Sequence, residues 1–271
     1  MYDTPAVAFF DVDGTLIWHD PDANAAQNVA HAQVTPGVKR AFERLHARGN
    51  LSFICTGRPR NLINQGLLDL NPTGLITSSG ACLFFEGRKV FERTIDLDLL
   101  HATVDWLMGE GIEVLFEGTD CSAALLPNGG VYTDIPGALS VHSWEELCAA
   151  TDLRFSKFSY AGDMIERVEQ MGEPLCSHYT FYNLGLGAGE AGPVGIDKAF
   201  GIAKALEQLN HSTKNTYAFG DSENDLPMLR AVETSIAMDN AMDVVKAQAD
   251  YVTDSAAHDG VATGLAHFGL I

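Results

Sequence analysis

The sequence predicts an α/β fold: a doubly wound, Rossmann-like parallel sheet interrupted by a second, α+β module. Two observations carry this prediction. In the first and last thirds of the chain, short apolar runs of strand length alternate with amphipathic, helix-like segments. This is the rhythm of parallel strands joined by helical crossovers. In the middle third, pairs of strand-like runs are joined by turn signals, which is typical of an antiparallel sheet.

The first strand–helix–strand repeats can be followed from the N-terminus. Residues 6–10 (AVAFF) form a short apolar run, as expected for a strand that is buried on both faces. A helix-like segment from Pro36 to Gly49 follows, with apolar side chains on one face. Residues 51–56 and 74–77 predict the next two strands, so we expect these three strands to be parallel neighbours.

The middle of the chain departs from this rhythm. Residues 82–95 contain two strand-like runs around a glycine turn, which is a hairpin signal. Further strands and helices are expected up to a glycine-rich stretch, residues 184–192, beyond which the βα alternation returns. We interpret this stretch as a linker and expect hinges there and at Gly80. The predicted domains are a core of residues 1–81 and 188–271 and an inserted cap of residues 82–187.

Composition and charge exclude several classes of partner. The net charge is −19, and the 17 Lys and Arg residues form no basic run. Nucleic acids and anionic membranes require clustered basic residues, so neither is an expected partner. The five cysteines are odd in number, widely spaced and free of C-x-x-C pairs, as is common in a reducing compartment. With neither a signal-peptide pattern nor a long apolar stretch, we predict a cytoplasmic protein.

Polar residues cluster where predicted strands end. The carboxyl ends of parallel strands meet at one edge of a sheet, and ligands bind there. Taken singly, such residues are often helix caps, turn formers or solvated side chains, but we expect this group to form one site. Its members are Asp11 and Asp13 after the first strand, Thr56-Gly57-Arg58 after the second, Gly220 to Asp225 after a later one, and Lys198 at a helix start.

These residue types suit phosphoryl transfer. A carboxylate can attack phosphorus and form an aspartyl-phosphate. Clustered acids can hold Mg²⁺, which prefers oxygen ligands and shares its coordination shell with water and phosphate. A hydroxyl, backbone N–H groups and a lysine can neutralise the oxygens of the transferring group. An acidic protein that binds phosphate needs such a local cation.

In their order along the chain, these segments resemble the four motifs of the haloacid dehalogenase-like (HAD) phosphohydrolase superfamily. The stretches are FFDVDGTLI, ICTGR, the segment at Lys198, and FGDSENDLPML. The resemblance implies that Asp11 is the nucleophile and Asp13 the general acid/base. It implies a Mg²⁺ site made by Asp11, by Asp13 through its backbone carbonyl, and by Asp221. It also implies phosphate or substrate binding by Thr56, Gly57, Lys198 and Asn224, supported by Arg58 and Asp225.

The position of the inserted cap indicates which subgroup of this superfamily the sequence resembles. The cap lies between Thr56 and Lys198, and the tail from residue 238 to 265 matches the Cof-type group (type IIB, with a C2 cap) over essentially the whole chain. Two positions depart from the usual pattern of that group. Ser79 stands where Asn is usual, and Ala199 follows the motif lysine where Gly is usual. Both bear on substrate fit more than on the chemistry.

The resemblance implies Mg²⁺-dependent hydrolysis of phosphate monoesters, such as sugar phosphates or similar small phosphometabolites, through an aspartyl-phosphate. Two alternatives stay open: a phosphosugar mutase, because phosphomannomutase-like proteins share this class of cap, and a non-catalytic phosphoacceptor or ligand sensor. The sequence identifies neither the substrate nor the oligomeric state. Lys157, alone in an apolar strand-like run, could reach a substrate anion or extend to water.

Overall fold

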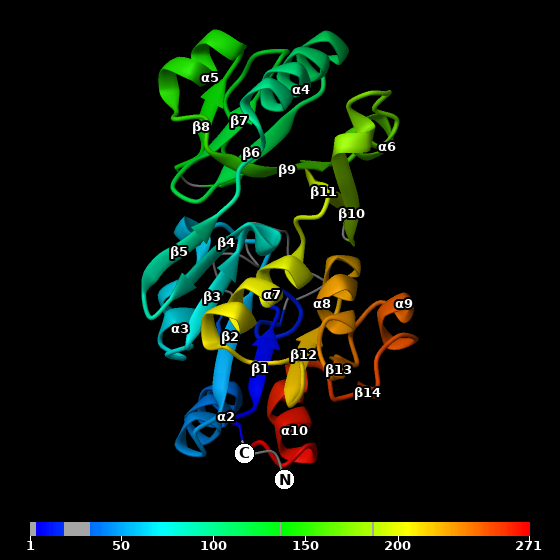
Figure 1. The fold of residues 1–271 in the computed structure, drawn as a ribbon. Helices are drawn as coiled ribbons and strands as arrows, with labels where there is room; N and C mark the ends of the chain where they lie inside the picture. The colour runs from blue at the N-terminus through cyan, green and yellow to red at the C-terminus, as the bar shows by residue number, and fades with distance from the viewer. Residues whose placement is uncertain (1–3, 19–32, 136, 186) are drawn as a thin grey trace. The chain divides into compact units, whose positions relative to one another are not determined.

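The chain divides into two compact units, which we call the core unit and the cap unit. The computed structural model describes residues 4–18, 33–135, 137–185 and 187–271. The core unit comprises Met1–Arg58, Leu62–Glu92 and Asp197–Ile271, and the cap unit comprises Pro59–Asn61 and Arg93–Ile196. The elements of each unit are labelled in Figure 1. The predicted class, a parallel α/β core with an α+β insertion, is confirmed.

The core unit is built on one eight-stranded sheet of order β14-β13-β12-β1-β2-β3-β4-β5. The strands from β14 to β3 run parallel, and β4 and β5 add an antiparallel edge. Their bounds are Val7–Phe10 (β1), Leu51–Cys55 (β2), Gly74–Thr77 (β3), Cys82–Phe85 (β4), Arg88–Glu92 (β5), Thr216–Gly220 (β12), Thr234–Ala237 (β13) and Tyr251–Val252 (β14). The first three strands lie within a residue of their predicted positions.

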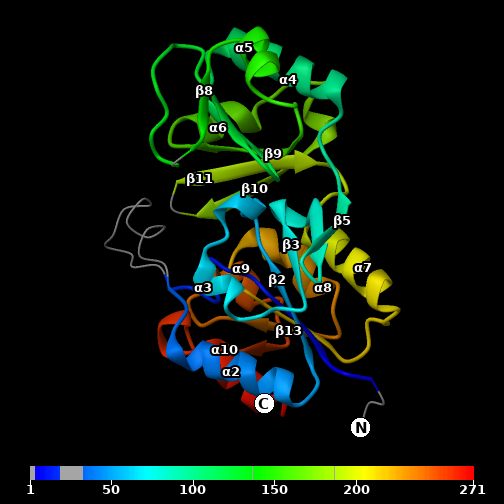
Figure 2. The same cartoon turned by 90° about the vertical axis from the view of Figure 1, so that its left-hand side faces the viewer.

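Helices cover both faces of the core sheet. Helices α2 and α10 contact each other on one face, whereas α7 packs against α8 and against β2, β3 and β4 (Figure 2). The bounds are Pro36–Ala47 (α2), Gln65–Leu68 (α3), Lys198–Leu209 (α7), Leu226–Arg230 (α8), Asp243–Lys246 (α9) and Gly260–His267 (α10), with 3₁₀ turns Arg60–Leu62 (η1), Ser78–Gly80 (η2), Glu223–Asp225 (η4) and Ala256–His258 (η5). No helix in the described part of the chain is long and apolar enough to span a bilayer.

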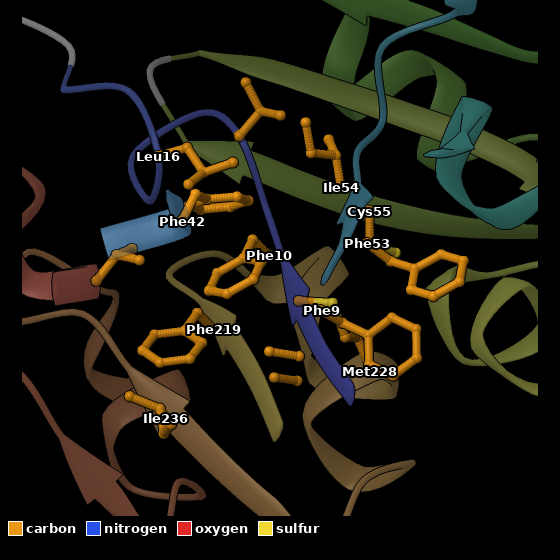
Figure 3. Packing of buried hydrophobic residues seen from close by; sticks show 14 of the residues in the cluster. Phe9, Phe10, Leu16, Phe42, Phe53, Ile54, Cys55, Phe219, Met228 and Ile236 are labelled. Atoms are coloured by element: carbon orange, nitrogen blue, oxygen red, sulfur yellow. The ribbon is translucent and has the colours of Figure 1, made fainter. Parts of the chain in front are cut away.

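Aromatic side chains on β1 anchor the core on both faces of the sheet. The ring of Phe10 lies 4.8 Å from that of Phe42 on α2 and 5.0 Å from that of Phe219 on β12 (Figure 3). Phe9, next along the strand, packs at 5.4 Å against Phe53 on β2. Neighbouring residues of a strand point to opposite faces. Strand β1 is therefore buried on both sides and holds its carboxyl end in a fixed position.

The cap unit is a sheet with helices packed on one face, and its strands pair antiparallel except for β7 and β8, which are parallel. Its strand order is β10-β11-β9-β6-β7-β8. Apolar residues of α4, α5 and α6 form one cluster with Phe116, Phe158 and their neighbours on that face. The bounds are Leu97–Glu110 (α4), Val114–Gly118 (β6), Ser122–Leu125 (β7), Leu139–Val141 (β8), Trp144–Ala150 (α5), Phe155–Ala161 (β9), Met164–Glu169 (α6), Cys176–His178 (η3), Tyr179–Gly185 (β10) and Ala188–Pro193 (β11).

The structure moves both predicted boundaries of the insertion. The hairpin of β4 and β5 was expected to open the cap, but β4 folds back on β3, with Thr77 paired to Cys82, and extends the core sheet. A hairpin that directly follows an edge strand can pair with that edge at little cost in loop closure. The insertion therefore begins at Arg93 instead of Cys82.

The second boundary moves for a similar reason. The glycine-rich stretch 184–192 is not a linker, because most of it belongs to β10 and β11, which pair with each other and join the cap sheet through β9. Leu186, within that stretch, lies outside the described residues. The insertion ends at Ile196. Gly80 is buried inside the core unit and not at a crossing between the units, so the structure does not place the predicted hinge there.

Candidate active site

The site is built at the carboxyl end of β1. Asp11 is the first residue beyond this strand and is 4% exposed. Its backbone N–H donates to the carbonyl of Phe219 on β12, at 3.0 Å. The parallel pairing of β1 with β12 on one side and β2 on the other thus carries the residues after all three strands to the same edge.

Lys198 reaches this edge from the first turn of α7. Asp197 is the N-cap of the helix, and its side chain accepts a hydrogen bond from the backbone N–H of Phe200 at 2.9 Å. This cap fixes where the helix begins. The Lys198 side chain is 1% exposed, and its Nζ lies 2.6 Å from Oδ1 of Asp11 and 2.5 Å from Oδ1 of Asp225. The lysine therefore bridges the ends of β1 and β12.

Asp225 organises the loop after β12. Its Oδ2 accepts hydrogen bonds from the backbone N–H groups of Asp221 and Ser222, at 2.8 Å and 3.1 Å. Asn224 accepts a hydrogen bond from the Ser222 hydroxyl at 2.8 Å. Both Asp225 oxygens are thus engaged, one by Lys198 and one by the loop. Asp225 therefore anchors the loop after β12 to Lys198.

Asp221 is packed directly against the loop after β1. Its Oδ1 accepts a hydrogen bond from the Thr15 hydroxyl at 3.1 Å. Gly14 has a φ of +84°, and a Cβ on it would lie 2.2 Å from Oδ2 of Asp221. Only glycine fits here, because any side chain would overlap the carboxylate and strain the backbone. The close approach brings Asp221 to Asp11.

Asp13 and Arg58 form a pair beside this cluster. Arg58 Nε lies 2.9 Å from one Asp13 oxygen, and a terminal guanidinium nitrogen lies 2.5 Å from the other. The Asp13 side chain is 41% exposed, whereas Arg58 is largely buried. Fork-to-fork contacts of this kind fix orientation as well as charge. The sequence indicated both residues but not that they pair.

Thr56 and Gly57 lie in the loop after β2. Thr56 is fully buried, and its Oγ1 accepts a hydrogen bond from the backbone N–H of Arg58 at 3.1 Å. Its hydroxyl hydrogen remains able to donate to an anion. Gly57 is partly exposed. The carbonyls of Thr56 and Arg58 accept hydrogen bonds from the backbone N–H groups of Ser79 and Ser78, at 3.1 Å and 3.0 Å, which ties this loop to the turn after β3.

Comparison with known proteins identifies the family. Residues 8–265 match the model of the haloacid dehalogenase-like hydrolases. The chain belongs to this family. It is 43% identical over 261 residues to the 5-amino-6-(5-phospho-D-ribitylamino)uracil phosphatase YcsE of Bacillus subtilis, covering 96% of this chain and 94% of that protein. It is 27% identical over 281 residues to YwtE, a phosphatase of the same name in that organism, covering 93% and 94%.

Solved structures place this HAD hydrolase among those with the same kind of cap. The HAD subclass IIB sugar phosphatase BT4131 superposes with a TM-score of 0.81 at 25% identity, over 98% of this chain and 100% of that one. BT1666, a HAD phosphatase from Bacteroides thetaiotaomicron, gives a TM-score of 0.82 at 24% identity, over 98% and 96%, and supports the fold. The predicted resemblance to Cof-type, subclass IIB phosphatases is confirmed, and the chain is a HAD-like phosphatase.

Burial and neighbouring charges shift the pKa values of the acidic residues and the lysine in the site of this HAD hydrolase. Burial, followed by the charge of Asp225, raises the pKa of Asp11 to about 7, although Lys198 opposes this. Burial and the charges of Asp225 and Asp11 also raise the pKa of Asp221 well above its usual range. Burial alone would lower the pKa of Lys198, but Asp11 and Asp225 raise it well above the usual value. Lys198 is therefore positively charged, and it faces a cluster of three carboxyl groups, those of Asp11, Asp221 and Asp225.

A divalent cation fits this donor set. Asp11, Asp221 and Asp225 each offer an oxygen, and these oxygens all lie within 4.8 Å of one another. Hard oxygen donors suit Mg²⁺, and a cation there would offset the repulsion that raises the pKa of Asp11 and Asp221. Asp11 and Asp221 are the better ligands, because Asp225 is already saturated by hydrogen bonds. The Asp13 carboxylate faces Arg58, so a contribution through its backbone carbonyl stays a prediction.

Asn240 lies in the tail segment of residues 238–265, and the sequence assigned it no role in the site. Its Nδ2 donates to the carbonyl of Gly14 and its Oδ1 accepts from the backbone N–H of Ala256, both at 2.8 Å. Gly14 is the residue that packs on Asp221. Asn240 is therefore a positioning residue that holds the loop after β1 against the proposed metal ligand.

Ser79 and Ala199, which depart from the usual pattern of the group, lie near the start of α7. Ala199 directly follows Lys198, and Ser79 belongs to the turn η2, which contacts α7. Ser79 has a φ of 54°, in the left-handed region that Asn and Gly adopt more readily than Ser. Its neighbour Gly80 packs so closely that a Cβ would lie 1.8 Å from the carbonyl oxygen of Asp197. This turn therefore supports the start of α7, and the backbone conformation explains why Asn is usual at the position of Ser79.

Proposed function

We propose that this phosphatase hydrolyses phosphate monoesters of small metabolites in a Mg²⁺-dependent reaction that passes through a phosphorylated Asp11. The observation that carries the proposal is the placement of Asp11. It is a buried carboxylate at a strand end, held by Lys198 and within reach of Asp221. A carboxylate fixed in this way can act as a nucleophile towards phosphorus.

In the first half of the reaction, an Asp11 oxygen bonds to phosphorus and the bond from phosphorus to the leaving oxygen breaks. Asp13 gives a proton to that oxygen, so the leaving group departs as an alcohol. In the second half, Asp13 takes a proton from water, whose oxygen attacks phosphorus and releases inorganic phosphate and the Asp11 carboxylate. The Thr56 hydroxyl and Lys198 hold the phosphoryl oxygens and reduce their negative charge in both steps.

Asp11 and Asp221 would hold the Mg²⁺ ion, with the backbone carbonyl of Asp13 as a further donor. When bound, such an ion supplies positive charge to the phosphoryl oxygens and favours ionised Asp11. Asp225 keeps Lys198 and the Asp221 loop in register. Arg58 orients Asp13 through hydrogen bonds to both of its oxygens, and the remaining lone pairs of these oxygens can take a proton.

The names of two relatives suggest a substrate. Both are 5-amino-6-(5-phospho-D-ribitylamino)uracil phosphatases, one of them 43% identical to this chain. We propose that the substrate here is of the same kind: a phosphate on a polyhydroxyl chain. Sugar and alditol phosphates fall within this class.

A leaving-group comparison tests the proposal. Asp11→Asn keeps the shape of the side chain and removes the attacking charge, so turnover of p-nitrophenyl phosphate should fall by several orders of magnitude. Asp13→Asn should slow ribitol 5-phosphate about 10²–10⁴-fold, the usual contribution of a general acid. It should slow p-nitrophenyl phosphate less, because p-nitrophenolate leaves without a proton.

The matched control is Asp98→Asn, which makes the same change at an exposed aspartate in the first turn of α4 and should leave both rates unchanged. Near-normal turnover by folded Asp11→Asn protein would rule out Asp11 as the nucleophile. An equal loss on both substrates in Asp13→Asn would show that Asp13 only positions other groups.

A further inference from the structure

The turn that follows β3, residues Ser78–Gly80 (η2), has an unusual backbone. The φ angles of Ser78, Ser79 and Gly80 are 52°, 54° and 98°. Glycine adopts such angles freely, whereas the Cβ of any other residue then lies close to a carbonyl oxygen. Single serines in this region are uncommon, and here two follow each other. Backbone strain of this kind persists only where the surrounding structure holds it, and it is concentrated at functional sites.

The hydroxyls of Thr77 and Ser78 do not hold this conformation. Thr77 stands at the N-cap of the turn, where a hydroxyl usually accepts a hydrogen bond from a backbone N–H, but its side chain accepts none there. Both hydroxyls are buried, since the residues are 0% and 1% exposed, and neither makes a hydrogen bond to the described part of the chain. The left-handed conformation of Ser78 therefore depends on backbone contacts.

Two backbone contacts join the turn to the loop after β2. The N–H of Ser78 donates to the carbonyl of Arg58 at 3.0 Å, and the N–H of Ser79 donates to the carbonyl of Thr56 at 3.1 Å. Because each peptide unit is planar, the dihedral angles of Ser78 set the direction of the next N–H. A change to negative φ at Ser78 would turn the Ser79 N–H away from Thr56. The strained turn and the loop after β2 therefore hold each other in place.

Gly80 joins the turn to the start of α7. A Cβ on Gly80 would lie 1.8 Å from the carbonyl oxygen of Asp197, the N-cap of this helix. Lys198 follows directly, and its Nζ lies 2.6 Å from Asp11. The turn η2 thus contacts two segments of the core unit: the loop that carries Thr56 and the helix start that carries Lys198. These are the two side chains proposed to hold the phosphoryl oxygens.

We propose that Ser78 and Ser79 are positioning residues, whose left-handed backbone holds Thr56 and Arg58 ready for phosphate and makes the turn itself respond to phosphate binding. The inference rests on the proposed function, in which Thr56 binds phosphoryl oxygens and Arg58 orients Asp13. Groups that are fixed before the substrate binds need no reorganisation during the reaction. Because coupling between two sites is reciprocal, phosphate bound by Thr56 must in turn stabilise η2.

A pair of substitutions at Ser79 tests this in the full-length protein with Mg²⁺. Asparagine tolerates positive φ, whereas threonine keeps the hydroxyl and adds a β-branch that disfavours it. Ser79→Thr should raise the inhibition constant of inorganic phosphate and lower kcat/KM for p-nitrophenyl phosphate, each about three- to tenfold, as expected for a weakened hydrogen bond. Ser79→Asn should keep both constants within about twofold of the wild type, because Asn adopts the left-handed region readily.

Ser78→Ala separates the backbone from the side chain. It removes the unpaired hydroxyl and keeps the N–H that donates to Arg58, so both constants should change less than about twofold. A loss as large as that of Ser79→Thr would show that the hydroxyl acts, and would overturn the backbone role.

The control is Glu86→Thr, which introduces the same β-branch at an exposed left-handed residue, with a φ of 47°, in the turn between β4 and β5. It should lower the melting temperature as Ser79→Thr does, without changing inhibition by phosphate. Equal changes in inhibition for the two variants, or none in either, would show that η2 only supports the fold. If Ser79→Thr does not fold, amide exchange in the wild type decides the question.

Amide hydrogen exchange measures the coupling without turnover. Inorganic phosphate at about nine times its dissociation constant should slow exchange of the Ser78 and Ser79 N–H groups about tenfold, because the loop must release phosphate before these hydrogen bonds open. The Glu86 N–H, which donates to the Thr73 carbonyl, should exchange at an unchanged rate. Unchanged exchange at Ser78 and Ser79 would overturn this inference alone. A wild type that neither binds phosphate nor hydrolyses p-nitrophenyl phosphate would instead overturn the proposed function.

Discussion

Replacing Asp11 by asparagine should stabilise the metal-free protein at high pH. Burial and Asp225 raise the pKa of Asp11 from 3.8 to about 7, so the folded state holds this proton over a range where the unfolded chain has released it. A group of this kind adds stability below its unfolded pKa and loses it as the pH rises through its folded pKa. Asparagine cannot ionise and removes that loss.

The magnitude follows from the size of the rise. A rise of roughly three pH units corresponds to about 4 kcal/mol, since each unit is worth about 1.4 kcal/mol. We therefore expect Asp11→Asn and wild type to differ little in pH dependence up to about pH 4. Between pH 4 and 8 the free energy of unfolding of the wild type should fall relative to the variant, by up to about 4 kcal/mol.

The assay is urea unfolding in EDTA, followed by far-ultraviolet circular dichroism at several pH values between 4 and 9. Mg²⁺ provides a second arm: at about one hundred times its dissociation constant it should stabilise the wild type by about 2.7 kcal/mol and Asp11→Asn by much less. A stability difference between the two proteins that stays constant with pH would refute the electrostatic reasoning. So would a wild type that gains stability over the variant as the pH rises in EDTA.

Three further predictions concern the metal and the supporting loops. EDTA should abolish turnover and Mg²⁺ restore it, whereas Ca²⁺ should inhibit because it favours a larger, looser shell; full activity in chelator would contradict this. Gly80→Ala should lower the melting temperature and kcat far more than Gly87→Ala, because both have positive φ but only Gly80 meets the Asp197 carbonyl; equal effects would mean that backbone strain alone matters. Asn240→Ala should raise the Mg²⁺ concentration for half-maximal activity several-fold by freeing Gly14, and an unchanged metal response with a lower melting temperature would show a purely structural role.

The sheet and the membership of the site were predictable because they depend on local pattern and one topological rule. Residues 6–10, 51–56 and 74–77 are short apolar runs between turn signals, and they became β1, β2 and β3. Parallel strands share a carboxyl edge, so Asp11 and Asp221 had to approach each other once the strands were assigned.

What the sequence could not show was pairing at the level of whole sheets and single side chains. The hairpin of residues 82–92 has the same pattern whether it joins the core sheet or the cap sheet, and the free edge of β3 decided between them. Glycines at 185–192 looked like a linker, although a strand pair without bulky side chains has the same composition. The contact of Asp13 with Arg58 depends on rotamers, which residue spacing does not encode.

The position of β1 in the middle of the core sheet has a consequence for how the chain is synthesised and folds. Its neighbour β2 follows within some tens of residues, but its other neighbour, β12, begins only at Thr216. Until that segment leaves the ribosome, one side of β1 is an open, apolar edge that invites wrong pairing. Joining it demands contacts of very long sequence separation, which are slow to form. We expect nascent chains whose β12 segment has not yet left the ribosome to depend on chaperones, and no product that ends before Asp221 to acquire a working catalytic centre.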